Sequence, residues 1–445
     1  MNSPISGTSQ RAGTSRRLRT AVLAVAVVAP VCGSFAVAGV ASAAPSSAPL
    51  VVWVDSTRVP MIKAYEKAFP NVKIDLVVYN GNANGSGVLQ SKIALYNRVG
   101  SGWPDVVFSE ENNDAASLAN AQFHYPAALN KGLVPSSVLD GYAKGTMAGC
   151  TINGTVYCLR NDLAQNLFWY NSALMKQFGY SVPTTWQQWQ ALGEQVAAHH
   201  PGYLVGSAGD TWTDDLYLWP SRCPANDVVG PNTIEINLSS PNCTRAAALV
   251  DPLIKDGSVT LESVFSSTFD KTYTDKILAL VGPSWYGADL FPGLVPKGDL
   301  AAADPLSWAG QKPATGEVGG GLWFMSSHAK DPAAAAAMLT WLSTSWGSQG
   351  ISVGYPAYVA DQTKWIAGQQ ASGFYSDQIG PVFATAATEI WPDWSPVPWS
   401  TDSIWASTVS PALTSGSTMV SQLAAYGQQL TDFAQSDGYT VVTKS

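Results

Sequence analysis

Apolar and polar positions recur along the first part of the chain with two different periods. Residues 49–56, 72–80 and 104–110 are short apolar runs that predict three strands. Residues 58–70 and 88–100 repeat their apolar positions at helical spacing instead, so a helix is expected between each strand and the next. Strands that alternate with helices in this way predict an α/β fold with a parallel sheet and crossover helices.

The later part of the chain is mostly helical in pattern, with two exceptions. A helix is predicted over 182–200, capped by Thr184 or Thr185, and another over 331–345. Residues 316–327 read as a glycine-rich strand. Residues 389–405 carry four tryptophans and three prolines, and the prolines oppose one continuous helix. We therefore expect irregular chain there, whose indoles could line a binding surface.

Polar residues follow each of the first three predicted strands. Asp55, Asn80 and Glu110 stand at these positions, with Glu111 directly after Glu110. Because open α/β sheets bind ligands outside the carboxyl ends of their strands, these residues are candidate ligand contacts. For Glu110, a carboxylate that caps the following helix is the alternative interpretation.

The first 43 residues have the pattern of a secretory signal peptide. Arginines precede an apolar run over 21–40, and Ala-Ser-Ala at 41–43 offers a cleavage site. Cys32 could carry a lipid anchor, but Pro30 and Val31 stand where small residues are expected, so we favour export without an anchor. The expected location is extracellular or associated with the cell envelope, because no later apolar run is long enough to span a bilayer.

Composition narrows the possible partners. The chain has 24 basic and 32 acidic residues, and loss of the leader would leave 20 basic ones and a net charge of −12. Such an acidic protein lacks the basic patches that bind nucleic acid, so no nucleic-acid partner is expected. The sequence has 17 Trp and 17 Tyr but only 13% charged residues, which suits the apolar faces and hydroxyl edges of a sugar. Aromatic rings also suit a cation, so they do not prove a sugar.

Four cysteines remain after the leader, and four cysteines allow three pairings. Cys150 and Cys158 flank a predicted hairpin whose turn is Asn153-Gly154, so we favour the local pairing, which leaves Cys223 with Cys243. A zinc site is disfavoured because the spacings are wrong and no histidine is near. Structural disulfides also agree with export.

An enzyme is the second class to weigh. Glu110 and Glu111 are neighbours, so their side chains diverge and do not form a pair for glycoside hydrolysis. The four histidines show no metal-binding spacing, and no nucleophile elbow, zinc-protease or phosphate-loop motif occurs. We therefore expect no enzymatic activity, no cofactor and no metal.

Five stretches in order resemble a known family. They are KAYEKAFPNVKIDLVVY, GSGWPDVVFSE, the run from INGTVYCLRNDL to VPTTWQQWQAL, GPSWYG, and GGGLWFMSSHAKDPAAAAAMLTWL. Together the chain resembles the extracellular solute-binding proteins of bacterial sugar ABC importers, in the maltose-binding-like group. The resemblance implies a two-lobe periplasmic-binding-protein fold of type II, with a mainly parallel sheet flanked by helices in each lobe.

The same resemblance implies where the lobes and partners are. Residues 44–158 plus 296–348 would form the first lobe, and residues 159–295 plus 349–445 the second. A monomer would close over a carbohydrate by hinge motion and deliver it to permease subunits in the membrane. A free-standing secreted lectin or sensor, or a receptor for another solute, remains the alternative.

The resemblance also implies site residues, each of which could instead be a packing residue. Trp285 matches the position in the family that stacks on the ligand, and the late aromatic cluster of the family matches Trp391, Trp394 and Trp405, whereas Trp399 is expected to pack. Further implied contacts are Asp162, Trp212 with Asp210 behind it, and the backbone at Gly319 and Gly320. Arg160 departs from the family, which has proline there.

Overall fold

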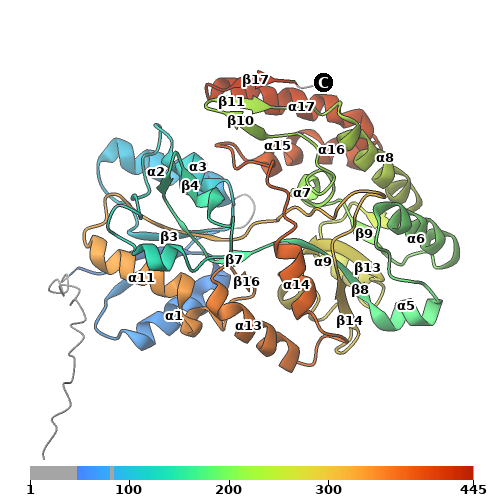
Figure 1. Ribbon diagram of the computed structural model, residues 1–445, viewed down its shortest axis with the longest axis horizontal. Coiled ribbons are helices and arrows are strands. Elements are labelled where there is room, and N and C mark those ends of the chain that lie inside the picture. Colours follow the sequence, from blue (N-terminus) through green and yellow to red (C-terminus); the bar gives the residue numbers. More distant parts are fainter. Residues whose placement is uncertain (1–47, 81–84, 444–445) are drawn as a thin grey trace, which may run out of the picture. The chain divides into compact units, whose positions relative to one another are not determined.

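The structure is a computed structural model that describes residues 48–80 and 85–443 (Figure 1). The predicted leader, with Cys32, lies outside the described residues, so export without an anchor stays a prediction. Within the described ranges no helix combines the length and the apolar character that a membrane crossing requires.

The first sheet has the strand order β2-β1-β3-β15-β6. β1 (Leu50–Val54) pairs in parallel with β2 (Ile74–Val78) and β3 (Val106–Ser109), as the hydrophobic pattern predicts. β15 (Leu322–Met325) is antiparallel to β3 and carries β6 (Leu159–Arg160) at the edge. Figure 1 shows helices on both faces of this sheet, α1 and α11 on one and α2 and α3 on the other. Their bounds are Val59–Ala68 for α1, Gly85–Val99 for α2, Asp114–Ala119 for α3 and Pro332–Thr344 for α11.

The second sheet centres on β8 (Asn166–Asn171), which lies between β13 (Ala279–Pro283) and β14 (Leu300–Ala303). β8 is antiparallel to both neighbours, whereas β9 (Gly206–Ser207) and β12 (Val259–Thr260) pair in parallel. The expected mainly parallel pairing therefore needs correction at β8. The physical reason is that β8 enters the second sheet from the crossing strand β7, and it runs opposite to β13 and β14, which come later in the chain.

The chain passes between the two sheets several times. β7 (Asp162–Leu163) pairs with β16 (Tyr355–Pro356), and residues 315–321 return from the second sheet to the first. β14 falls within the range expected for the first lobe, yet it pairs with β8. β6 falls within the range expected for the second lobe, yet it pairs with β15. The lobe boundaries stay a prediction. β14 and β6 each pair with a strand of the other sheet, so these two strands depart from the expected ranges.

The remaining elements are helices and short strands. The other helices are α4 (Ser136–Leu139), α5 (Ser172–Phe178), α6 (Trp186–His199), α7 (Thr213–Tyr217), α8 (Pro241–Asp256), α9 (Ser267–Tyr273), α10 (Tyr286–Asp289), α12 (Trp346–Gln349), α13 (Val359–Ala371), α14 (Gly380–Ala387), α15 (Thr401–Thr408), α16 (Ser410–Thr414) and α17 (Met419–Ser436), with 3-10 turns at Ser56–Arg58 and Ala148–Cys150. The other strands are β4 (Thr151–Ile152), β5 (Thr155–Val156), β10 (Asp227–Gly230), β11 (Thr233–Glu235) and β17 (Thr440–Val442). Thr185 caps α6 by accepting from the backbone N–H of Gln188, which decides between the two predicted caps.

Two hydrophobic cores form on opposite faces of the second sheet. Leu167 and Trp169 of β8 point into the core that also includes the first sheet, and Phe168 between them points into the other core. This alternation follows from the two-residue period of a strand. The second core gathers α6, α8, α15 and α17, and it holds Trp394, Trp399 and Trp405 of the tryptophan-rich segment.

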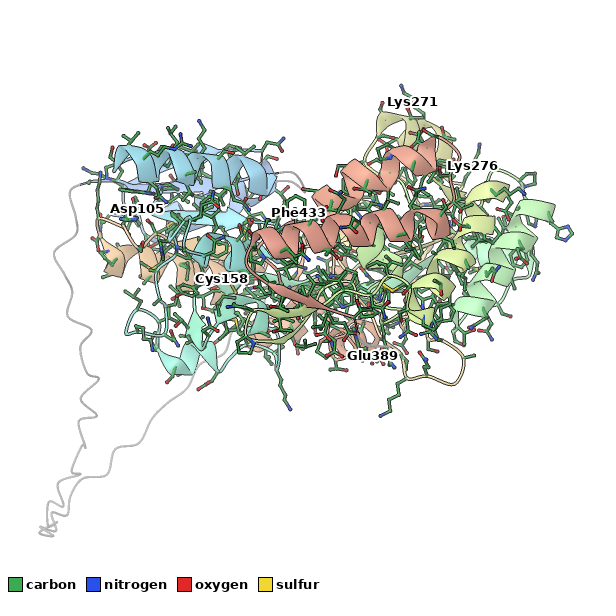
Figure 2. The ribbon with its side chains drawn as sticks, turned by 90° about the horizontal axis from the view of Figure 1, so that it is seen from above. Asp105, Cys158, Lys271, Lys276, Glu389 and Phe433 are labelled. Carbon is green, nitrogen blue, oxygen red and sulfur yellow. A yellow bond between two sulfur atoms is a disulfide. The ribbon has the colours of Figure 1, made fainter. Side chains whose placement is uncertain are left out.

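Both predicted disulfides are present. Cys150 bonds Cys158, labelled in Figure 2, and Cys223 bonds Cys243. Between the first pair, β4 and β5 form the predicted hairpin, with Asn153 and Gly154 at φ of 50° and 76°. Positive φ at both positions is what a tight turn of this kind requires.

Candidate functional site

A cavity of about 420 Å³ lies beside the tryptophan-rich segment. Its wall includes Trp219, Trp391, Trp394 and Trp399. Polar groups on the same wall come from elsewhere in the chain, and they include Asn113, Lys144, Arg160, Asn226, Glu317 and Thr401. The volume is in the range of small-molecule sites, and the mixture of rings and polar groups is typical of them.

The aromatic part of this wall is held by stacking and by a backbone contact. The rings of Trp219 and Trp394 are 5.3 Å apart and 9° from parallel. The indole N–H of Trp219 donates to the backbone carbonyl of Trp391 at 2.8 Å. The guanidinium of Arg222 lies 4.7 Å from the centre of the Trp391 ring. Trp391 is half-buried, so part of its ring faces the cavity.

The polar part of the wall centres on a buried ion pair. Arg160 donates to both carboxylate oxygens of Glu317, at 3.2 and 2.9 Å. Their side chains are 5% and 8% exposed, so the pair is fixed and largely desolvated. Gly320 makes room for it, because a Cβ there would overlap Nη2 of Arg160. Gly320 thus leaves space for the guanidinium of Arg160, the residue that departs from the family pattern.

A second polar group lies at the carboxyl ends of β1 and β3. Arg58 donates to Glu110 at 2.9 Å and lies 3.6 Å from Asp55, which caps the following turn. The guanidinium also lies over the ring of Phe108, at 4.2 Å. Burial raises the pKa of Glu110 to about 7, against the opposing effect of Arg58. Two of the three strand-end candidates therefore share one cation, whereas Asn80 is exposed and joins neither group.

A second aromatic cluster surrounds Trp285. Its ring is nearly parallel to that of Phe265, at 6.0 Å and 15°, and Trp212 lies edge-on at 6.4 Å. The indole N–H of Trp285 donates to the carbonyl of Val318, in the segment that also holds Glu317. Phe265 is 51% exposed, so the cluster presents an aromatic surface to solvent. Trp285 and Trp212 are thus brought together, but neither is among the residues that line the cavity.

Two predicted contacts are enclosed by protein. Asp162 is 2% exposed and accepts from the side-chain amide of Asn161 at 2.8 Å. A Cβ on Gly354 would overlap its carboxylate. Burial raises the pKa of Asp162, and Arg58 partly opposes this shift. Trp405 has no exposed surface and packs edge-on against Tyr426. In this conformation both side chains are packing residues.

Three tryptophans of the tryptophan-rich segment, Trp391, Trp394 and Trp399, line the cavity, although Trp399 was expected to pack. Ligand contact by Trp391 and Trp394 stays a prediction. The carbonyl of Trp399 accepts from the side chain of Asn113 at 2.9 Å, which ties the segment to the turn after β3. Sequence reasoning missed Trp219, Asn113 and Glu317. The one signal for Glu317 was a charged residue inside a glycine-rich strand.

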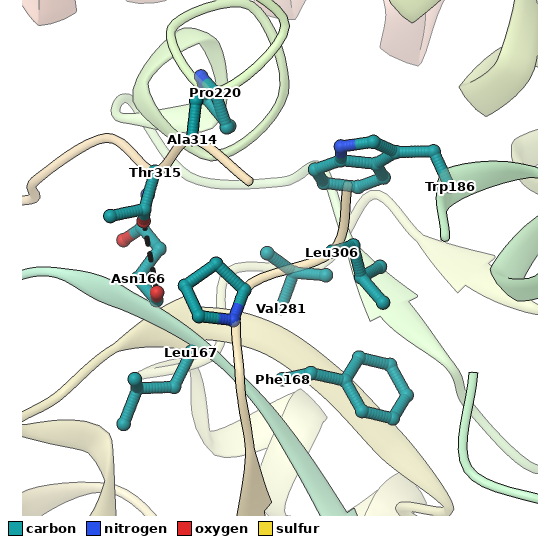
Figure 3. A pocket seen from close by; sticks show the side chains of 10 residues that line it. Asn166, Leu167, Phe168, Trp186, Pro220, Val281, Leu306, Ala314 and Thr315 are labelled. Carbon is teal, nitrogen blue, oxygen red and sulfur yellow. Dashed lines mark hydrogen bonds between the residues drawn. The ribbon is translucent and has the colours of Figure 1, made fainter. Parts of the chain in front are cut away.

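A separate small cavity lies in the second core. It has a volume of about 10 Å³, enough for about one water molecule and too small for a sugar. Figure 3 shows Trp186, Phe168, Val281 and Leu306 around it, with the hydroxyl of Thr315 bonded to the carbonyl of Asn166. This cavity is therefore a packing defect of the core.

Asp214, Asp215 and Asp402 are the one group among the described residues with side chains placed to hold a metal ion.

Solved structures of low sequence identity share the fold. A binding protein from B. animalis subsp. lactis Bl-04, solved with beta-1,6-galactobiose, matches with a TM-score of 0.75 at 19% identity, over 89% of this chain and 99% of that one. The galacto-N-biose-/lacto-N-biose I-binding protein of Bifidobacterium longum matches at 0.74 and 16%, over 89% and 99%. The GacH receptor of Streptomyces glaucescens, solved with acarbose, matches at 0.69 and 15%, over 88% and 99%.

The comparison with curated protein sequences gave no match. The family model described as bacterial extracellular solute-binding protein matches residues 53–347. This range runs from within β1 to beyond β15 and holds the whole of the second sheet. The α/β fold, the order of the motifs and this match agree, so the chain belongs to the bacterial extracellular solute-binding protein family.

Proposed function

We propose that this protein is the substrate-binding subunit of an ABC importer and captures a mono- or oligosaccharide. The observation that carries the proposal is the cavity of about 420 Å³, which combines a wall of four tryptophans with fixed polar groups. A sugar has apolar C–H faces that pack on aromatic rings and hydroxyls that require donors and acceptors.

Each part of the wall has a role in this proposal. Trp391 presents its half-buried ring to a sugar face, and the stacked Trp219–Trp394 pair supports it. Arg160, Glu317 and Asn113 offer groups to sugar hydroxyls. The ion pair is already formed, so binding requires little reorganisation of these side chains.

The cluster of Trp285, Trp212 and Phe265 provides a second aromatic surface. Val318 joins it to the cavity, because Val318 follows Glu317 and accepts from Trp285. We place further sugar units of a longer ligand on this surface, with Glu110, Asp55 and Arg58 as polar partners at the ends of β1 and β3. The three solved structures were determined with beta-1,6-galactobiose, lacto-N-biose and acarbose, which supports a carbohydrate ligand.

A sugar panel tests the binding step. The purified chain is titrated with disaccharides and trisaccharides while tryptophan fluorescence and Tm are followed. At least one sugar is expected to shift both, because four indoles line the cavity. If amino acids, peptides or polyamines shift them and no sugar does, the carbohydrate assignment fails.

Uptake tests the transport step. We expect cells that lack the gene to lose uptake of the sugar that the protein binds, and a copy with intact binding to restore it. Uptake that continues unchanged would favour the alternative, a free-standing secreted carbohydrate-binding or sensing protein. The extracellular family supports an exported receptor, and no catalytic role is proposed.

A further inference from the structure

Three carboxylates meet beside the ligand cavity with a fourth nearby, and the proposed function uses none of them. Asp214 and Asp215 belong to α7, Asp402 to α15, and Glu111 to the turn after β3. Asp214, Asp215 and Asp402 each offer an oxygen, and these oxygens all lie within 4.8 Å of one another. Oxygens bound to one calcium ion at 2.3–2.6 Å are separated by at most about this distance.

All four carboxylates are buried, and two of them have an oxygen without a hydrogen-bond partner. Asp214 is 0% exposed, Asp215 5%, and Asp402 and Glu111 9% each. The hydroxyl of Tyr426 donates to Oδ2 of Asp214 at 2.6 Å. Oδ1 of Asp214 and Oδ1 of Asp215 have no hydrogen-bond partner. Buried carboxylate oxygens normally accept a hydrogen bond or bind a cation, so two unpartnered ones in one group call for a ligand.

No basic side chain supplies the missing charge. The ion pairs found among the described residues involve Asp55, Glu66, Glu110 and Glu317, and none of the four carboxylates. The charges of Asp402, Asp214 and Glu111 all act on Asp215. Glu111 also lies close enough to Asp402 and Asp114 for their charges to interact. A cation among these side chains would balance their like charges.

The ligand chemistry identifies the cation. The set offers only carboxylate oxygens, which hard cations prefer, and it has no thiolate or imidazole. Calcium accepts six to eight oxygens in flexible geometry, whereas magnesium demands a tight octahedron and keeps its water. We propose that Asp214, Asp215 and Asp402 bind one calcium ion, with Glu111 adding its charge from the turn after β3.

Such an ion would act on the cavity wall. Asp402 follows Thr401, and Glu111 lies two residues before Asn113; both neighbours line the cavity. Asn113 in turn bonds the carbonyl of Trp399. Calcium would therefore fix the turn after β3 against α7 and α15, and hold the tryptophan segment in place.

Calorimetry on the full exported chain tests the site without any sugar. The protein is first treated with EDTA, dialysed at pH 7.5 and titrated with calcium chloride. One equivalent is expected to bind with a Kd of roughly 10⁻⁴ M or below, the range of extracellular calcium modules and tighter sites. At saturating calcium we expect Tm to rise by several degrees, because the ion binds only the folded state.

Two variants separate calcium from protons. Asp215→Asn and Asp402→Asn should each weaken calcium binding at least about tenfold, since each removes a charged ligand. In EDTA the same variants should melt at or above the wild-type Tm, because repulsion among the buried carboxylates falls. Asp361→Asn is the matched control: Asp361 is 4% exposed with one unpartnered oxygen, but it lies outside the group and should keep the full response.

Three results would overturn the site. The first is no heat and no Tm shift with calcium in the wild type, which would leave protons as the neutralising charge. The second is an equal response to magnesium, which would remove the calcium assignment. The third is an unchanged calcium affinity in both variants. None of these outcomes depends on sugar binding, so the failure of this site and the failure of the proposed function are distinguishable.

Discussion

Trp391 is the side chain whose removal tests the aromatic wall of the cavity most directly. Its backbone N–H donates to Thr315 at 2.8 Å and its carbonyl accepts from Trp219, and Trp391→Ala keeps both contacts. The lost intramolecular contacts are the one with Arg222, 4.7 Å from the ring, and the packing of the half-buried ring against the second core. A cation–π contact at a partly exposed site contributes about 0.5–1 kcal/mol and half-burial of the ring roughly 1 kcal/mol, so the free energy of unfolding should fall by about 2 kcal/mol.

The affinity for the sugar should fall by about this much or more. Burying an aromatic face against a sugar contributes about 1.5–3 kcal/mol, which corresponds to a rise in Kd of roughly 10- to 150-fold. Isothermal titration with the sugar that shifts the wild type measures this change. Trp391→Phe should recover part of the affinity, because it keeps a flat apolar ring.

A matched control removes the same kind of side chain elsewhere. Trp346 of α12 is 39% exposed, and Lys364 lies 5.8 Å from its ring, but it does not line the cavity. Trp346→Ala should leave the Kd unchanged. Equal Kd values for the wild type and Trp391→Ala would refute the aromatic wall as the sugar site.

Three further predictions concern charge, covalent links and the second aromatic cluster. Burial raises the pKa of Asp210 to about 6, so the folded state holds this proton more tightly than the unfolded chain. The resulting stability is complete below about pH 4 and is lost as pH rises through 6, by about 3 kcal/mol, and Asp210→Asn should lose this part of the pH dependence in urea unfolding. An unchanged slope in the variant would contradict this assignment. Replacing Cys223 and Cys243 by Ala opens a loop of sequence separation 20 and should lower the free energy of unfolding by about 3 kcal/mol, while full stability in the variant would show that the bridge constrains little. Trp285→Ala should weaken binding of a trisaccharide at least about tenfold and that of a disaccharide less, and equal effects would place both ligands on the same rings.

The first sheet could be predicted because its signals are local. The apolar runs and the helices between them fix β1, β2 and β3 in parallel, and Asn153-Gly154 brings Cys150 to Cys158. The direction of β8 could not be predicted in this way. An apolar run shows that a strand is buried but carries no information about which neighbour it pairs with or in which direction.

The candidate site depends on contacts far apart in the sequence, so only part of it could be predicted. Trp391 and Trp394 were expected from their segment, but Trp219 reaches Trp394 across 175 positions of the chain. Glu317 meets Arg160 at a separation of 157 residues. For Trp405 the resemblance implied a ligand contact, whereas the packing of α15 against α17 buries its ring. A motif fixes the position of a residue in the chain and leaves open which face of its element meets the cavity.

The central claim is that the cavity holds a carbohydrate. Its most direct test is native mass spectrometry of the exported protein, purified from cells grown on mixed oligosaccharides. The account predicts an added mass equal to a whole number of sugar residues, retained by Trp346→Ala and lost from Trp391→Ala. A bound mass that fits an amino acid, a peptide or a polyamine, retained by both variants, would contradict it.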